Sequence, residues 1–84
     1  MNQTEVFKIV DGERTYQESL GSDRTDGRNR TVGDELVLMD VYLRRAFDAW
    51  ADYAGDTAAL EQIRKVAAIA VRCMENHGAP GREY

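Results

Sequence analysis

The chain has 84 residues, one cysteine, one histidine and a net charge of -4, with a sequence pI near 4.9. This length excludes a second independent core, and one cysteine with one histidine provides neither an internal disulfide nor a zinc site of thiolates and imidazoles. The acidic balance argues against general nucleic-acid binding, because affinity for phosphate comes mostly from lysine and arginine.

The small size also predicts association. A chain this short buries only about 60 to 65% of its unfolded surface, so we expect a homo-oligomer to add to the core. No apolar run approaches the roughly 18 residues that span a bilayer, and no basic segment with a following apolar one precedes Glu5. We therefore expect a protein of the cytoplasm, of a cell or of an infected cell, without a membrane partner.

The first expected helix covers residues 4–19. Its apolar residues fit one face of a helix better than an alternating strand: Val6, Phe7, Ile9, Val10, Tyr16 and Leu20. Gly12 lies in the middle and costs about 1 kcal/mol relative to alanine in a helix interior, which allows a kink or an early end near Asp11. Residues 21–31 form a polar loop, with no apolar residue from 21 to 30. This loop is either a solvated connector or a segment that closes over a ligand or partner.

The second expected helix covers residues 32–54. Thr31 and Asp34 resemble a capping box with aspartate in place of glutamate. An apolar stripe then recurs in steps of three and four, as in a helix packed lengthwise on others: Val32, Leu36, Met39, Leu43, Ala46, Trp50 and Tyr53. Further apolar residues outside this stripe exceed what one contact face requires, and a dimer interface would account for them.

The third expected helix covers residues 57–77. Gly55 ends the preceding helix and Asp56 or Thr57 caps this one, so the short connection makes the two helices antiparallel neighbours. Gly78 and Pro80 stop the helix and leave a flexible tail at 78–84. The predicted fold class is all-α, a three-helix antiparallel bundle in one domain that oligomerisation completes.

Three sets of side chains are candidates for function, and no nucleophile elbow, phosphate-cradling loop or dinucleotide fingerprint provides a catalytic residue. The basic residues form an anion or nucleotide site if the first and last helices pack side by side, and are otherwise ordinary solvated groups: Arg14, Arg64, Lys65 and Arg72. The predicted interface set contains the aromatic residue types that dominate binding surfaces: Val37, Val41, Tyr42, Phe47, Trp50 and Tyr53. Two explanations remain open for this set. It forms core or self-association surface, or it binds a heterologous partner.

The third set consists of acids, because a magnesium site needs several carboxylates that converge from facing helices. If the protein is an enzyme, the metal ligands are expected to be Asp34, Glu35, Asp40 and Glu61. The alternative is that these acids are solvated or interact with helix ends. The one histidine, His77, is explained by its place near the carbonyls at a helix C-terminus.

Several short segments resemble small MazG-like proteins common in bacteriophage genomes. They are Glu-Arg-x-Tyr-Gln at 13–17, Thr-Val-Gly-Asp-Glu at 31–35, and the helix sequence from Ile63 to Pro80. The resemblance implies an oligomeric helical protein that hydrolyses nucleoside triphosphates to release pyrophosphate with magnesium. It also implies a metal signature of Glu-Glu-x-x-Glu on one helix and Glu-x-x-Asp on the next.

The chain departs from that signature at two positions. Leu38 stands three residues after Glu35, and Arg64 stands three residues after Glu61. A guanidinium in place of a carboxylate removes a metal ligand and adds a like charge. The favoured hypothesis is therefore a phage-type binding protein without catalysis and without cofactor, which acts on a protein partner, such as a host defence component, or sequesters a nucleotide. The alternative is a magnesium-dependent MazG-like pyrophosphohydrolase.

Overall fold

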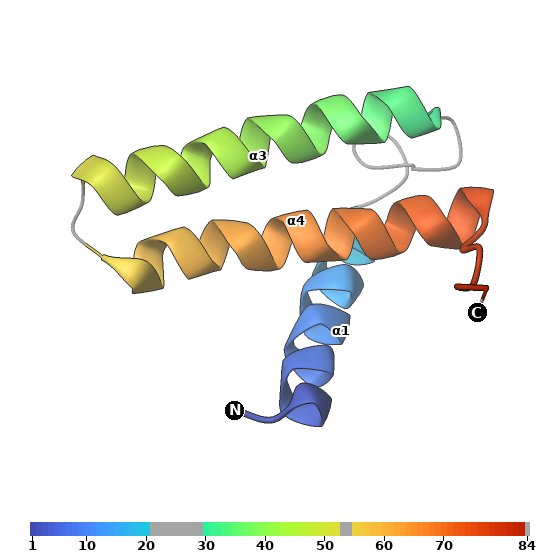
Figure 1. Cartoon of the computed structure of the whole chain (residues 1–84), viewed down its shortest axis with the longest axis horizontal. Coiled ribbons are helices and arrows are strands. Elements are labelled where there is room, and N and C mark those ends of the chain that lie inside the picture. Colours follow the sequence, from blue (N-terminus) through green and yellow to red (C-terminus); the bar gives the residue numbers. More distant parts are fainter. Residues whose placement is uncertain (21–29, 53–54, 84) are drawn as a thin grey trace.

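The computed structural model describes residues 1–20, 30–52 and 55–83. These ranges contain three helices and no strand: α1 (Gln3–Ser19), α3 (Val32–Asp52) and α4 (Asp56–His77) (Figure 1). The predicted all-α class with three helices is confirmed for the described residues. Predicted residues 21–29 of the polar loop, positions 53 and 54 of the second helix and position 84 of the tail lie outside them.

The helices form an antiparallel hairpin with a third helix laid across it. Figure 1 shows α3 and α4 side by side and running in opposite directions, while α1 packs against α4 and points away from the pair. The short connection after Asp52 explains the hairpin, because helices joined by few residues become antiparallel neighbours. The lengthwise packing expected for all three helices is therefore seen for α3 and α4, and α1 adopts a crossing orientation.

Capping boxes fix the starts of two helices. The Asn2 side chain accepts a hydrogen bond from the Glu5 backbone at 2.9 Å, and the Glu5 side chain accepts one from the Asn2 backbone at 3.3 Å. Thr31 and Asp34 form the predicted box at the start of α3, with bonds of 2.9 and 3.0 Å. Each box satisfies backbone N–H groups that a helix start leaves unpaired.

Glycines at the ends of α4 have backbone angles that other residues rarely adopt. Gly55 caps the N-terminus with φ 145° and no side-chain hydrogen bond, so neither of the predicted caps, Asp56 and Thr57, is used. Gly78 has φ 109° and donates its N–H to the Met74 carbonyl at 2.9 Å, as expected for a helix-ending glycine. In contrast, Gly12 lies within an uninterrupted α1, so the kink or early end near Asp11 does not occur.

The interior of the described chain is small. Its buried apolar residues are Ala46, Ala68 and Ile69. The predicted α3 stripe is only partly inside, with Ala46 buried and Met39 half-buried. The exposed members of that stripe are Val32, Leu36, Leu43 and Trp50, and Tyr53 lies outside the described residues. The residues of α3 that contact α4 therefore lie at one edge of this stripe, and the other members of the stripe face solvent.

Candidate functional site

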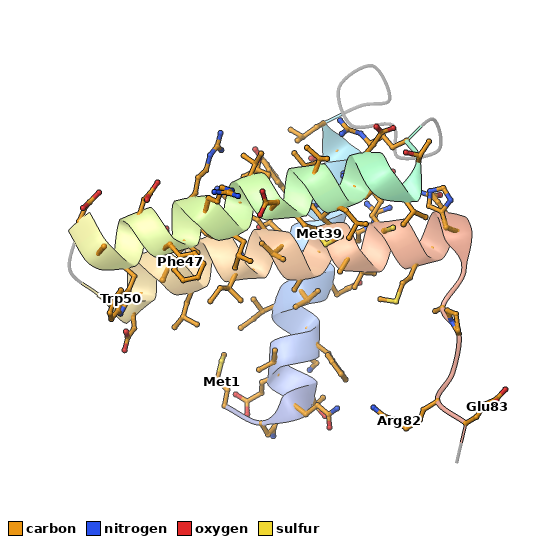
Figure 2. All side chains as sticks on the ribbon, turned by 45° about the horizontal axis from the view of Figure 1, so that its top comes forward. Met1, Met39, Phe47, Trp50, Arg82 and Glu83 are labelled. Carbon is orange, nitrogen blue, oxygen red and sulfur yellow. The ribbon has the colours of Figure 1, made fainter. Side chains whose placement is uncertain are left out.

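An apolar surface covers one side of the α3–α4 hairpin. We call it the hairpin face. Its α3 residues are Val32, Leu36, Leu43, Phe47 and Trp50, and its α4 residues are Leu60, Ile63, Ala67, Ala70 and Met74. Each row advances in steps of three, four or seven residues, which places its members on one side of a helix. Figure 2 shows Phe47 and Trp50 toward the end of the hairpin where α3 is joined to α4, away from the tail residues Arg82 and Glu83.

A hollow of about 400 Å³ lies at this end of the hairpin face. Its lining is entirely apolar and comes from both helices: Leu43, Ala46, Phe47, Trp50, Ala59 and Ile63. Phe47 is 67% exposed and Trp50 is 59% exposed. Aromatic side chains at the edge of an apolar hollow are the typical anchors of protein–protein interfaces.

A hydrogen bond positions Trp50 at the rim. Its indole Nε1 donates to Asp56 Oδ1 across the α3–α4 connection at 3.2 Å. The polar edge of the indole is thus paired within the chain, while much of its apolar surface faces solvent. A tryptophan held in this way needs little further ordering to contact another protein.

The predicted interface residues do not form one surface. Phe47 and Trp50 belong to the hairpin face, whereas Val37 and Val41 lie on another flank of α3, exposed by 67% and 38%. Tyr42 is half-buried and lines a different cavity. Tyr53 lies outside the described residues.

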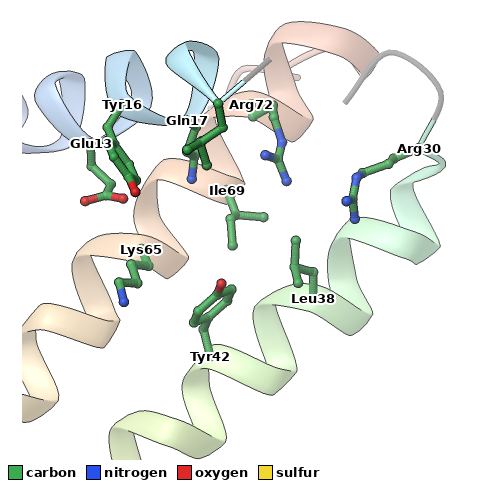
Figure 3. Close-up of a pocket in the computed structure, with 10 residues that line it drawn as sticks. Glu13, Tyr16, Gln17, Arg30, Leu38, Tyr42, Lys65, Ile69 and Arg72 are labelled. Atoms are coloured by element: carbon green, nitrogen blue, oxygen red, sulfur yellow. The ribbon is translucent and has the colours of Figure 1, made fainter. Parts of the chain in front are cut away.

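That second cavity, of about 230 Å³, lies where the three helices meet (Figure 3). We call it the basic cavity, because three cations and one carboxylate line it. It is lined by Glu13, Tyr16, Gln17, Leu20, Arg30, Leu38, Tyr42, Lys65, Ile69 and Arg72. The Lys65 ammonium lies 5.7 Å from the centre of the Tyr42 ring, and the Arg45 guanidinium lies 4.9 Å from it. Both contacts lie within the range of cation–π attraction.

A buried ion pair closes one wall of this cavity. Arg72 Nε donates to Glu35 Oε2 at 3.0 Å, and its terminal nitrogen donates to both Glu35 oxygens at 3.1 and 2.9 Å. The two side chains are 3% and 1% exposed. Arg30 Nε lies 3.6 Å from Glu35 Oε1. His77 Nε2 donates to the Arg30 backbone carbonyl at 2.8 Å. The start of α3 therefore contacts the end of α4 through a buried ion pair and through a hydrogen bond at the surface.

The predicted basic residues each have a partner within the chain. Arg14 pairs with Glu75 at 2.8 Å and with Glu18, and Arg64 pairs with Glu13 at 2.8 Å. Arg14 and Arg64 join α1 to α4, while Lys65 and Arg72 reach the basic cavity. The structure thus brings two of the four predicted anion ligands to one cavity.

The predicted acids are distributed over separate interactions. Asp34 forms the α3 capping box, Asp40 pairs with Arg44 on the surface at 2.8 Å, and both Glu35 oxygens accept bonds from Arg72. Glu61 is exposed on α4. Within the described residues, no group of three or more potential ligands from His, Cys, Asp and Glu is placed to hold a metal. The acids that the structure describes do not fit the magnesium site that the resemblance implies.

Hydrogen bonds explain the one clear carboxyl shift in this region. The backbone N–H and the hydroxyl of Thr31 hold the pKa of Asp34 below its ordinary value, because both bond its charged form.

Sequence reasoning missed two participants. Arg30 was assigned to the polar loop, but it reaches Glu35 and lines the basic cavity. Ile63 is not among the predicted interface residues, yet it is 46% exposed and lines the apolar hollow. The matching three- and four-residue steps in α3 and α4 are the signal that could have revealed a shared face.

No family model, curated protein or solved structure matches the chain. Among the described helices, none combines the length and apolar character needed to cross a membrane.

Proposed function

We propose that the chain is a small helical binding protein without catalysis, and that it acts through protein–protein contacts made by the hairpin face. The observation that carries this proposal is the apolar hollow between Phe47 and Trp50, two large side chains that are more than half exposed. Apolar surface left uncovered in this way commonly marks an interaction site. The proposal also includes two points that follow from the resemblance to phage proteins. The chain is of phage type, and its partner is a protein of the host.

The dispersed acids support the non-catalytic part of the proposal. Glu35 and Asp34 are the residues that the resemblance would place in a metal site, and the carboxylate of each already accepts hydrogen bonds within the chain. To bind a cation, Glu35 would have to break its bonds with Arg72 and leave a buried guanidinium without its carboxylate. Loss of such a partner is costly in a protein interior.

The test is capture of proteins by the tagged chain from a lysate of the host cells in which the protein is proposed to act. Phe47→Glu places a charge at the rim of the hollow, and Val37→Glu makes the same change at a site of equal exposure, 67%, outside the hairpin face. We expect the parent and Val37→Glu to retain the same proteins, and Phe47→Glu to lose them. Equal capture by all three forms, or capture by none, would contradict the proposal.

A second candidate function is sequestration of a small anion or nucleotide in the basic cavity. Its support is the presence of Arg30, Lys65 and Arg72 around one cavity in a chain of net charge -4. Two tyrosine rings in the same lining offer surfaces on which a planar group can stack. Lys65 is the best residue to test, because Arg72 is already neutralised by Glu35.

Titration calorimetry with a panel of nucleoside triphosphates and magnesium tests this second function. Lys65→Ala should weaken binding about tenfold or more. The control is Lys8→Ala, which removes the other lysine of the chain from the exposed surface of α1 and should leave the affinity unchanged. Equal affinities in the two variants would contradict the assignment. Assay of the same mixtures for pyrophosphate tests the MazG-like alternative, since that reaction must release it.

A further inference from the structure

We propose that the basic cavity binds a small dicarboxylate, a molecule with a negative group at each end and a short apolar chain between them. This inference rests on the second candidate function, sequestration in the basic cavity, and names the class of molecule that is bound. It is carried by the positions of the uncompensated cations, by the apolar middle of the cavity and by its volume.

Two carboxylates lie at the cavity, and each already has a guanidinium as its partner. Glu35 accepts hydrogen bonds from Arg72 on both of its oxygens. Glu13, which belongs to the lining, accepts one from Arg64 at 2.8 Å. The charges within each pair cancel, so neither Arg72 nor Arg64 offers a net positive charge to an anion in the cavity.

Arg30 and Lys65 are the lining cations that remain. Arg30 Nε lies 3.6 Å from Glu35 Oε1, which is too long for a good hydrogen bond. The charge of Arg30 also acts on Asp34, but that carboxylate is exposed and does not line the cavity. Lys65 forms no ion pair with any carboxylate that the structure describes. Each of the two cations is therefore available to one anionic group.

These two charges lie at opposite ends of the cavity (Figure 3). Arg30 lies near Arg72, since both approach Glu35, and Arg72 follows Lys65 by seven residues, or two turns of α4. Two turns advance a helix by about 10 Å. With charge-assisted hydrogen bonds of about 2.8 Å at both ends, the negative groups of one bound molecule lie roughly 5 Å apart. A phosphate, whose charges share one centre, reaches only one end.

The space between the two charges is lined by apolar side chains. Ile69 is 2% exposed and lies between Lys65 and Arg72 on the same side of α4. Leu38 and the ring of Tyr42 line the cavity opposite it, from α3 (Figure 3). A hydrocarbon chain gains free energy when it leaves water for such a surface, so the middle of the cavity suits a spacer of methylene groups.

The volume of the cavity limits the length of that spacer. It measures about 230 Å³, below the roughly 300 to 1,000 Å³ of sites that hold drug-sized molecules. With carbon–carbon bonds of about 1.5 Å, two or three methylene groups bridge the roughly 5 Å between the anionic groups. Succinate and glutarate have this length, and both are small enough for the cavity.

NMR titration of the full chain labelled with ¹⁵N tests the inference at a fixed ionic strength. The probes are glutarate, butyrate, which has a single carboxylate on a similar chain, and inorganic phosphate. We expect glutarate to bind at least tenfold more tightly than either of the others, because it alone makes a charge-assisted hydrogen bond at each end. It should also shift the backbone amide signals of Lys65 and Ile69.

Two variants remove one end charge each and keep a long side chain, Lys65→Met and Arg30→Met. In both, the advantage of glutarate over butyrate should disappear, because one carboxylate loses its cation. Lys8→Met, on the exposed surface of α1, is the matched control and should keep the full advantage. Helix content from circular dichroism shows whether each variant is folded, and the parent and Lys65→Met decide the matter if Arg30→Met is not.

A parent that binds glutarate no more tightly than butyrate or phosphate overturns the dicarboxylate. Sequestration in the cavity would still stand in that case if a nucleoside triphosphate binds the same sample and Lys65→Ala weakens it. If neither class of molecule binds, both proposals fail. An advantage of glutarate that persists in folded Lys65→Met and Arg30→Met overturns the placement of its carboxylates at these two residues.

Discussion

Replacing Glu35 by glutamine keeps the shape of the side chain and removes its charge from the buried pair. The Arg72 side chain is 3% exposed, so its guanidinium would remain in the interior without its anionic partner. Breaking one side of a buried pair costs about 3 to 5 kcal/mol. An 84-residue chain has a total stability of roughly 4 to 13 kcal/mol, so we expect Glu35→Gln to lose a large part of it.

Urea unfolding followed by circular dichroism at 222 nm measures this loss, with protein concentration held fixed because association adds stability. The matched control is Asp40→Asn, which breaks a pair whose side chains are 56% and 76% exposed and should cost no more than about 1 kcal/mol. The double variant Glu35→Leu with Arg72→Met removes both charges together. It should be far less destabilised than the sum of its single variants.

Two results would refute this reasoning. The first is a Glu35→Gln variant no less stable than Asp40→Asn, which would mean that the pair is not buried. The second is a double variant whose loss equals the sum of the two single losses, because additive losses would show that Glu35 and Arg72 do not interact.

Three smaller predictions concern the helix ends and α1. Gly12→Ala should stabilise the chain by about 0.5 to 1 kcal/mol, since an added Cβ meets nothing within 4 Å; a lower midpoint of thermal unfolding would contradict it. Gly55→Ala should cost about 1 to 2 kcal/mol, because φ is 145° there, and urea unfolding without any loss would contradict that angle. The lowered pKa of Asp34 means that its carboxylate stabilises the fold above the ordinary value of 3.8, and that this contribution is lost as pH falls through the folded pKa. Asp34→Asn should therefore be less stable than the parent at pH 7, and the two should converge in acid; a difference that grows below pH 3.8 would show the opposite sign.

Local sequence signals were sufficient for the helices. The predicted starts of the first and third helices differ by one residue from those of α1 and α4, and the second predicted start, at Val32, coincides with that of α3. Capping residues and helix-ending glycines act through neighbouring backbone groups, so a local pattern contains the needed information. The cost expected for Gly12 does not interrupt α1, which begins at the Asn2 capping box and packs on α4.

The candidate sites depended on long-range geometry that periodicity does not specify. An apolar stripe shows which side of α3 avoids water, but the position of α4 decides which of its members are buried. That position left Leu43 and Trp50 exposed and buried Glu35 instead. Arg72 is predicted to be an anion ligand or a solvated group, but it lies three residues after the buried Ile69, and its pairing with Glu35 spans 37 positions of sequence.

The most direct test of the central claim uses Trp50, the only tryptophan in the chain. Its fluorescence reports on the hairpin face alone, and quenching by acrylamide measures how accessible the indole is. We predict weaker quenching and a blue-shifted emission maximum when a protein that the parent captures, with its own tryptophans replaced by phenylalanine, is added to the chain. Quenching that stays, in the presence of that protein, at the level of an indole that is 59% exposed would contradict binding through this face.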